Sequence, residues 1–254
     1  MENVTMGGNV LADMKRFKEA MHKVTAEPAW VKPQAAHDRR WNPYSFEGGS
    51  VAAIAGENFV VAATDTRMTV SGFSVMTREG DKIHVLNENI VLATSGFHGD
   101  VQQLKRVLDA RLHKYRFDYR CDMTVDLCAE LLARNLYYKR FFPYYTGAIL
   151  CGIDEHGKGA VYSYDPVGCI ERNPYEASGG GTTLLMPFLD NQLLQHHIKT
   201  DDRHSLTIER AIGLVKDAFN FVAERETSTG DAIEVVVAEA GKPTRKFTVA
   251  LRED

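Results

Sequence analysis

The chain has 254 residues, of which 44% are hydrophobic and 25% are charged, and it carries a formal net charge of −4. This composition is typical of a globular protein with a sizeable core, and it contains no basic block of the kind that binds nucleic acid. No apolar run approaches the roughly 20 residues that cross a bilayer. We expect no secretory signal, because the first residues contain no apolar segment.

Residues 1–39 differ from the rest and are predicted to form an N-terminal extension or pro-segment ahead of one domain over residues 40–254. Apolar residues at helical spacing within residues 11–24 indicate a weak amphipathic helix, and the prolines that follow favour an extended path. Acidic residues argue against a transit peptide. If the extension is processed, we expect cleavage near Arg39-Arg40.

The stretch from Gly48 to Arg67 is predicted to be a buried β-hairpin. Two runs of small and β-branched residues flank the turn residues Gly56-Glu57-Asn58. Both arms are rich in Ala and Val, so another layer can pack closely on either face. The second arm ends in Asp65 and Arg67, and charges at the lip of an apolar strand are either an ion pair or part of a site.

Beyond the hairpin, apolar runs bounded by turn residues predict strands, and apolar residues three and four apart predict helices. Asp100 is available as a cap or first-turn acid of the first helix, and Pro187 is expected in or near the first turn of the third. The predicted strands cover residues 73–77, 82–86, 90–95, 146–153, 159–164, 168–172, 232–238 and 244–251, and the predicted helices run from about residue 100 to 115, from 124 to before 143, from near 182, and from 207 to about 225.

This order of strands, two helices, strands, two helices and strands predicts an α+β fold. Packed in layers, it becomes a four-layer αββα sandwich of two antiparallel sheets flanked by helix pairs. No internal repeat or low-complexity segment interrupts the pattern, so we expect a single folded domain after the extension.

Several motifs of this chain, taken together, resemble those of proteasome β subunits, which are N-terminal-nucleophile hydrolases. The resemblance covers roughly Arg40 to the C-terminus. The runs at residues 140–145 and 95–100 are similar to the subunit type at the sixth ring position, which lacks peptidase activity. The motifs are Asp65-Thr66-Arg67, Lys82, Ser95-Gly96, residues 162–168, Ala177-Ser178-Gly179-Gly180 and Thr229-Gly230-Asp231.

The resemblance implies the N-terminal-nucleophile hydrolase fold and a proteasome β-type domain over residues 40–254. It implies a non-catalytic structural subunit of the 20S core, which shapes the chamber for ubiquitin-dependent and other protein degradation in the cytoplasm and nucleus. The implied partners are other β subunits in a seven-membered ring, the opposite β ring and α-ring subunits. No cofactor, metal, nucleic acid or membrane is implied.

The residue at the nucleophile position decides the predicted activity. An N-terminal threonine attacks through its hydroxyl while its own α-amine serves as base. In the family's pattern the nucleophile precedes the strand-end aspartate by sixteen residues, and counting back from Asp65 reaches Gly49. Because glycine has no hydroxyl, the resemblance implies an inactive subunit.

The other matched positions are interpreted as relics of the family's site. Asp65 and Lys82 match the orienting carboxylate and the lysine, and we expect them to form a partly buried ion pair. Ser178 and Thr229 match serines of the pattern, and Glu226 stands where the family has an aspartate.

Two alternatives stay open. Ser50 would serve as nucleophile if the Gly49–Ser50 bond were cut, although a one-residue shift along a strand points a side chain to the opposite face. The hairpin would therefore have to slip register for Ser50 to act. A free-standing binding module is the other alternative, and a stable monomer of native protein would favour it.

Other candidate motifs have simpler interpretations. Gly179-Gly180-Gly181 before a helix suggests a phosphate cradle, but tight packing or a turn is favoured because a P-loop lysine is missing. His196-His197 is expected in a solvated loop end rather than at a metal. The aromatic run at 141–145 is expected in the core or at a subunit contact rather than stacking on bases. The four cysteines form no C-x-x-C pair and are predicted to be reduced thiols.

Overall fold

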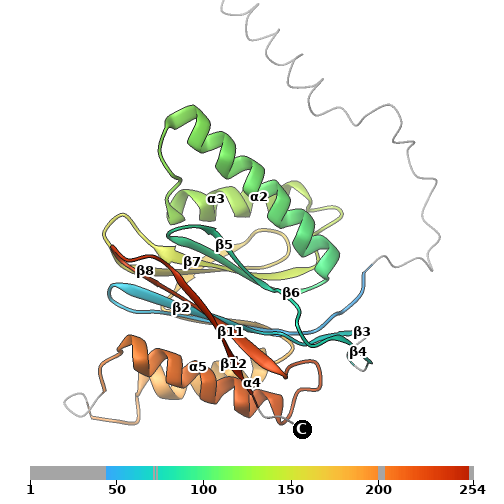
Figure 1. Ribbon diagram of the computed structural model, residues 1–254, viewed down its shortest axis with the longest axis vertical. Helices are drawn as coiled ribbons and strands as arrows, with labels where there is room; N and C mark the ends of the chain where they lie inside the picture. Colours follow the sequence, from blue (N-terminus) through green and yellow to red (C-terminus); the bar gives the residue numbers. More distant parts are fainter. Residues whose placement is uncertain (1–43, 71, 73, 200–203, 252–254) are drawn as a thin grey trace, which may run out of the picture. The chain divides into compact units, whose positions relative to one another are not determined.

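A computed structural model describes residues 44–70, 72, 74–199 and 204–251. The predicted extension over residues 1–39, with its amphipathic helix and its cleavage near Arg39-Arg40, lies outside these residues. The described chain forms four layers (Figure 1), with helices α2 (His98–Tyr119) and α3 (Val125–Tyr138) covering one sheet, and α4 (Thr182–Leu189) and α5 (Ile208–Ala223) covering the other. This confirms the predicted α+β sandwich of two sheets flanked by helix pairs.

The first sheet is built around the predicted hairpin. Its strand order is β10-β1-β2-β11-β12, and every neighbouring pair is antiparallel. The hairpin and the closing pair of strands are therefore both confirmed. The bounds are β1 Ser50–Ala55, β2 Phe59–Asp65, β10 Tyr175–Gly179, β11 Ala232–Glu239 and β12 Arg245–Ala250.

The second sheet has the order β5-β6-β7-β8-β9 and is also antiparallel throughout. A separate two-stranded sheet pairs β3 with β4. The bounds are β3 Met68–Val70, β4 Ser74–Thr77, β5 Ile83–Asn87, β6 Ile90–Gly96, β7 Thr146–Ile153, β8 Gly159–Tyr164 and β9 Ile170–Asn173.

The small side chains of β1 and β2 allow packing on both faces of the first sheet. Ala52 and Ala63 lie in the core beneath α4 and α5, whereas Ala53 and Ala62 lie in the core between the two sheets. All four are fully buried. A third core cluster lies between the second sheet and helices α2 and α3.

Helices α3 and α5 begin with a side-chain cap, whereas α2 does not. Thr124 and Thr207 cap α3 and α5, because each hydroxyl accepts a hydrogen bond from the backbone N–H three residues on. Helix α2 begins after Phe97, which offers no side-chain acceptor, and Asp100 lies in its first turn. Asp100 is therefore the first-turn acid and not the cap.

Three details differ from the sequence prediction. Strand β3 was not predicted, because its three residues are too few to show a period. Strand β10 was not predicted, because Pro174 before it and three glycines at 179–181 resemble a loop. Pro187 is the sixth residue of α4, in the second turn, so its expected place in or near the first turn was wrong. The chain continues from α4 as a π-helical turn over Asp190–Leu194.

No helix in the described ranges is long and apolar enough to cross a membrane.

Candidate functional site

The matched nucleophile position lies directly before β1. Gly48 and Gly49 have φ angles of +79° and +93°, a backbone conformation that L-residues rarely adopt. A Cβ built on Gly49 would lie 2.4 Å from Nζ of Lys82 and 3.1 Å from Oδ1 of Asp65. The lysine amine therefore occupies the space that any side chain at residue 49 would enter.

Asp65 and Lys82 form a buried ion pair, as predicted. Lys82 Nζ lies 2.9 Å from Asp65 Oδ1, with side-chain exposures of 6% and 0%. Lys82 also donates to the Arg67 carbonyl. Asp65 accepts hydrogen bonds from the N–H groups of Ser50 at 2.8 Å and Gly230 at 3.4 Å. Burial raises the pKa of the Asp65 carboxyl, while Lys82 and these N–H groups oppose the rise.

Ser50 faces a different set of atoms. Its Oγ accepts a hydrogen bond from the Gly181 N–H at 2.8 Å and lies 2.7 Å from Oγ1 of Thr229. Both hydroxyl residues are fully buried. Ser50 therefore faces the start of α4, whereas a side chain at residue 49 would face Lys82.

The other matched positions have partners of their own. Glu226 accepts a hydrogen bond from the Ser228 hydroxyl at 2.7 Å. The Ser178 hydroxyl lies so close to Gly147 that a Cβ there would be 2.2 Å from it. Thr229 is linked to Asp65 through Ser50, whose hydroxyl lies beside Thr229 and whose N–H donates to Asp65.

Arg67 forms a second ion pair, which decides between the two interpretations of its charge, an ion pair or part of a site. Its Nε lies 2.8 Å from Oδ2 of Asp231, and Arg78 also contacts that carboxylate. The Arg67 guanidinium covers Gly230, where a Cβ would lie 2.7 Å from its central carbon. This pair holds the loop whose Gly230 N–H reaches Asp65.

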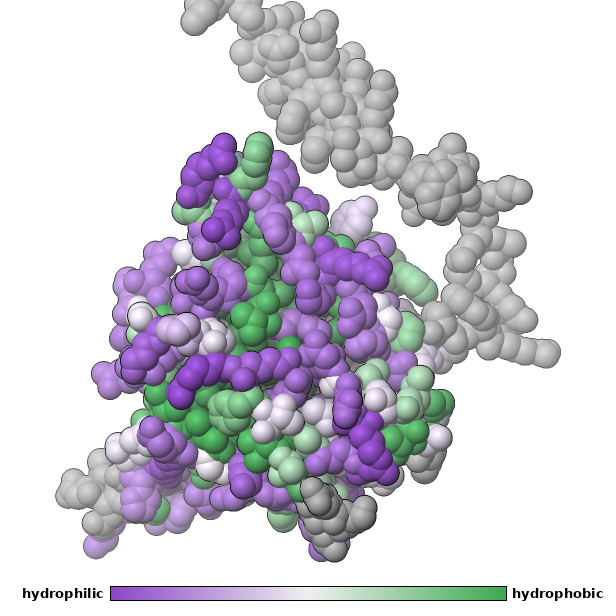
Figure 2. All heavy atoms as spheres, viewed as in Figure 1, coloured by the Kyte–Doolittle hydropathy of each residue, from purple (hydrophilic) through white to green (hydrophobic). Residues whose placement is uncertain are grey.

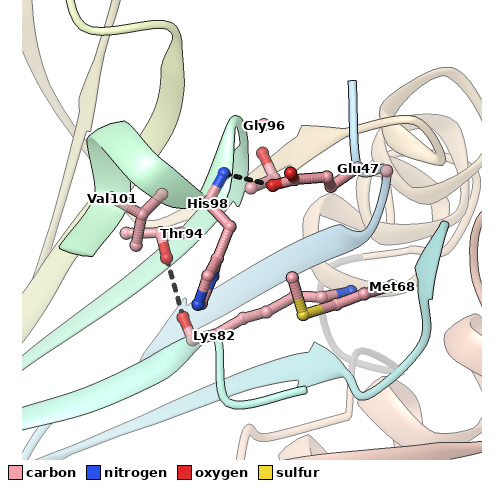
Figure 3. Close-up of a pocket in the computed structure, with 9 residues that line it drawn as sticks. Glu47, Met68, Lys82, Thr94, Gly96, His98 and Val101 are labelled. Carbon is pink, nitrogen blue, oxygen red and sulfur yellow. Dashed lines mark hydrogen bonds between the residues drawn. The ribbon is translucent and has the colours of Figure 1, made fainter. Parts of the chain in front are cut away.

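A small cavity beside Lys82 is lined in part by Glu47, a residue that the sequence analysis did not single out (Figure 3). Glu47 extends toward the start of α2, where the His98 N–H donates to its carboxylate. Thr94 donates to the Lys82 carbonyl across the same cavity, at 3.0 Å. No local pattern marks Glu47, because its partner lies 51 residues further along the chain.

The glycine run, the histidine pair and the cysteines lie in the kinds of environment that the sequence predicted. Gly179 packs tightly, since a Cβ there would lie 2.2 Å from the Gly49 carbonyl oxygen, and this confirms tight packing at residues 179–181. His196-His197 lies in an exposed turn, as expected. All four cysteines are free thiols, and the described residues contain no group of three or more metal-ligating side chains.

The proteasome subunit family matches residues 45–238 of this chain. The chain belongs to the proteasome subunit family. A Caenorhabditis elegans protein named proteasome subunit beta type-1 is 59% identical in an alignment that covers 99% of this chain and 98% of the relative. Relatives of the same name are 44% identical in Arabidopsis thaliana, over 79% of this chain and 91% of the relative, and 36% identical in Dictyostelium discoideum, over 90% and 98%.

Membership confirms the resemblance drawn from the motifs. Proteasome subunits form a threonine-type peptidase complex, so this chain assembles with other subunits of its family.

Proposed function

We propose that this chain is a non-catalytic β subunit of the 20S proteasome core, which shapes the proteolytic chamber. The observation that carries the proposal is the environment of Gly49. Residue 49 has no hydroxyl, and Nζ of Lys82 would lie 2.4 Å from any Cβ placed there. An attacking hydroxyl is the group on which this class of reaction depends. Gly49, Asp65, Lys82, Ser178, Glu226 and Thr229 are accordingly proposed as relics of a catalytic site.

The surroundings of Ser50 count against the alternative hydrolase. Its N–H donates to Asp65 and its hydroxyl is bonded to Gly181 and Thr229, all in the buried interior. For Ser50 to attack a peptide, strand β1 would have to lose pairing with both β2 and β10. A register slip of that kind would also turn the whole apolar pattern of β1 to the wrong face.

Exposed hydrophobic side chains support assembly with neighbouring subunits. In Figure 2, hydrophobic surface gathers at the side where Figure 1 shows β3 and β4, and Val70, Val75 and Met76 are more than 40% exposed. Phe141 is 92% exposed. Exposed apolar groups of this size are typical of protein–protein contacts. We propose the partners to be neighbours in a seven-membered β ring, the opposite β ring and α subunits, in the cytoplasm and nucleus.

Replacement of Ser50 by Ala tests the proposal in the assembled particle. Peptidase activities toward each class of peptide substrate are expected to stay within about twofold, because the hydroxyl takes no part in the reaction. Ser205→Ala, in the exposed loop before α5, is the matched control. Loss of one whole substrate class in Ser50→Ala particles of normal subunit composition would contradict the proposal.

A further inference from the structure

Residues 44–48 lead into β1, and both ends of this segment, which we name the strap, are held by specific contacts. At the first end, the Tyr44 hydroxyl donates to the Pro143 carbonyl at 2.8 Å. Its ring centroid lies 5.3 Å from that of Tyr145 and 5.8 Å from that of Phe142. Ring separations in this range are favourable for aromatic pairs. Tyr44 is thus held by two aromatic rings and one carbonyl acceptor.

At the second end, Glu47 is bound through both its backbone and its side chain. Its carbonyl accepts hydrogen bonds from the Thr69 N–H at 2.9 Å and from the Thr69 hydroxyl at 3.2 Å. Its carboxylate accepts the N–H of His98, the first residue of α2. Phe97 provides no side-chain cap for this helix, so Glu47 supplies the missing acceptor and places a negative charge where the helix dipole favours it.

Gly48, the last residue of the strap, is also held in one backbone conformation. Gly48 is buried and has a φ angle of +79°, and a Cβ there would lie 2.5 Å from Cβ of Ser228. Only glycine passes this point without displacing the loop that carries Ser228. The strap therefore enters β1 along one path.

From these contacts we propose that the surface formed by Thr69, His98 and residues 142–145 is a peptide-binding site whose ligand is the strap itself. The chemical class it recognises is an extended peptide with a phenol ring and, three residues further on, a carboxylate followed by glycine. In its bound position the strap caps α2 through Glu47 and supplies part of the wall of the cavity beside Lys82, since Glu47 and Gly48 both line it. The inference goes beyond the proposed function and does not rest on it.

Amide hydrogen exchange of the full-length chain tests this proposal, using the double variant Tyr44→Ala/Glu47→Ala. The Thr69 and His98 amides are both bonded to Glu47, so each is expected to exchange about tenfold faster or more when the strap is released. Glu47→Gln keeps an acceptor but loses the charge, and is expected to accelerate His98 less than Glu47→Ala does. Asp118→Ala, which removes an exposed ion pair at the other end of α2, is the matched control.

The reactivity of Cys151 separates release of the strap from opening of the whole domain, because this thiol is fully buried between the sheets. Faster exchange of Thr69 and His98 with Cys151 still unreactive toward a thiol reagent would support the proposal. Unchanged exchange in the double variant would overturn it. Faster exchange accompanied by Cys151 labelling would also overturn it, since the strap would then not be a separable ligand. None of these readouts depends on peptidase activity, so the outcome is independent of the Ser50→Ala test.

Discussion

At the scale of single residues, the buried pair of Asp65 and Lys82 connects the candidate site to the stability of the fold. Lys82 also donates to the Arg67 carbonyl and Asp65 accepts the Gly230 N–H, so the contacts are those of a satisfied interior ion pair. Breaking a buried pair costs more than the pair itself contributes, because one charge remains without a partner.

Lys82→Met is therefore expected to lower the free energy of unfolding by about 3–5 kcal/mol. Chemical denaturation of the purified chain measures this change. The double variant Lys82→Met/Asp65→Asn should recover part of the loss, because no unpaired carboxylate is left behind. Lys114→Met, in an exposed pair on α2, should cost far less. Equal losses in Lys82→Met and Lys114→Met would show that the interior pair is not what we describe.

Ser50 makes a second residue-scale prediction. Ser50→Ala removes the acceptor of the Gly181 N–H and the partner of Thr229, and we expect a loss of roughly 1–3 kcal/mol in the free energy of unfolding. Thr229→Ala breaks the same hydroxyl pair. Because the two residues share one hydrogen bond, the double variant should cost less than the sum of the single variants. Strict additivity in denaturation measurements would contradict the bond.

At the scale of elements, periodicity and turn residues predicted the strands of the second sheet well. The bounds of β7 and β8 agree with the sequence prediction, since each run is apolar and ends at clear turn residues. Strand β10 was missed because its identity depends on pairing with β1, 125 or so residues away in sequence, and not on local composition. The three residues of β3 are too few to show any period.

At the candidate site, too, motifs in the sequence identified some residues, whereas contacts between distant residues could not be predicted. The family resemblance matched Gly49 to the nucleophile position, which stays a prediction, and it matched Asp65 and Lys82, whose ion pair the structure confirms. It did not predict that Lys82 would occupy the space beside Gly49, or that Glu47 would cap α2. Both features depend on which side chains meet after folding.

The turn between β7 and β8 gives a prediction for pH dependence. Burial favours the neutral acid at Asp154, but hydrogen bonds from Arg172 and from two backbone N–H groups outweigh it and hold the pKa of this carboxyl below its ordinary value. A lowered pKa in the folded state means that the stabilisation is present above about pH 4 and is lost as the pH falls through the folded-state pKa.

Asp154→Asn should therefore destabilise the chain most at neutral pH, and the difference from the unmodified chain should shrink below about pH 4. Denaturation curves collected across the acid range measure this difference. Asp165→Asn, at the turn after β8, is a control for acidic turn residues that lack an arginine partner. A difference for Asp154→Asn that stays constant from neutral to acid pH would contradict the assignment.

At the scale of the whole molecule, the hairpin of β1 and β2 is the element on which the layers depend. Its small side chains are buried against helices on one face and against the second sheet on the other. A charge at Ala53 would have no room and no partner between the sheets, and buried unpaired charges destabilise by more than about 4 kcal/mol.

Ala53→Asp is expected to prevent incorporation of the chain into proteasome particles. Asn58→Asp introduces the same charge at the exposed turn of the same hairpin, so it should assemble normally. Quantification of the subunit in purified particles by mass spectrometry distinguishes the two variants. Normal incorporation of Ala53→Asp would contradict the buried position of β1.

The central claim is that this proteasome subunit contributes structure to the particle and no attacking group. The most direct measurement is the intact mass of every subunit after the particle reacts with a peptide electrophile that bonds covalently to hydroxyl nucleophiles. We predict that this chain keeps its mass while catalytic subunits of the same particle gain the mass of the adduct. An adduct on this chain, mapped to Ser50 or to any other hydroxyl beside Lys82, would contradict the claim.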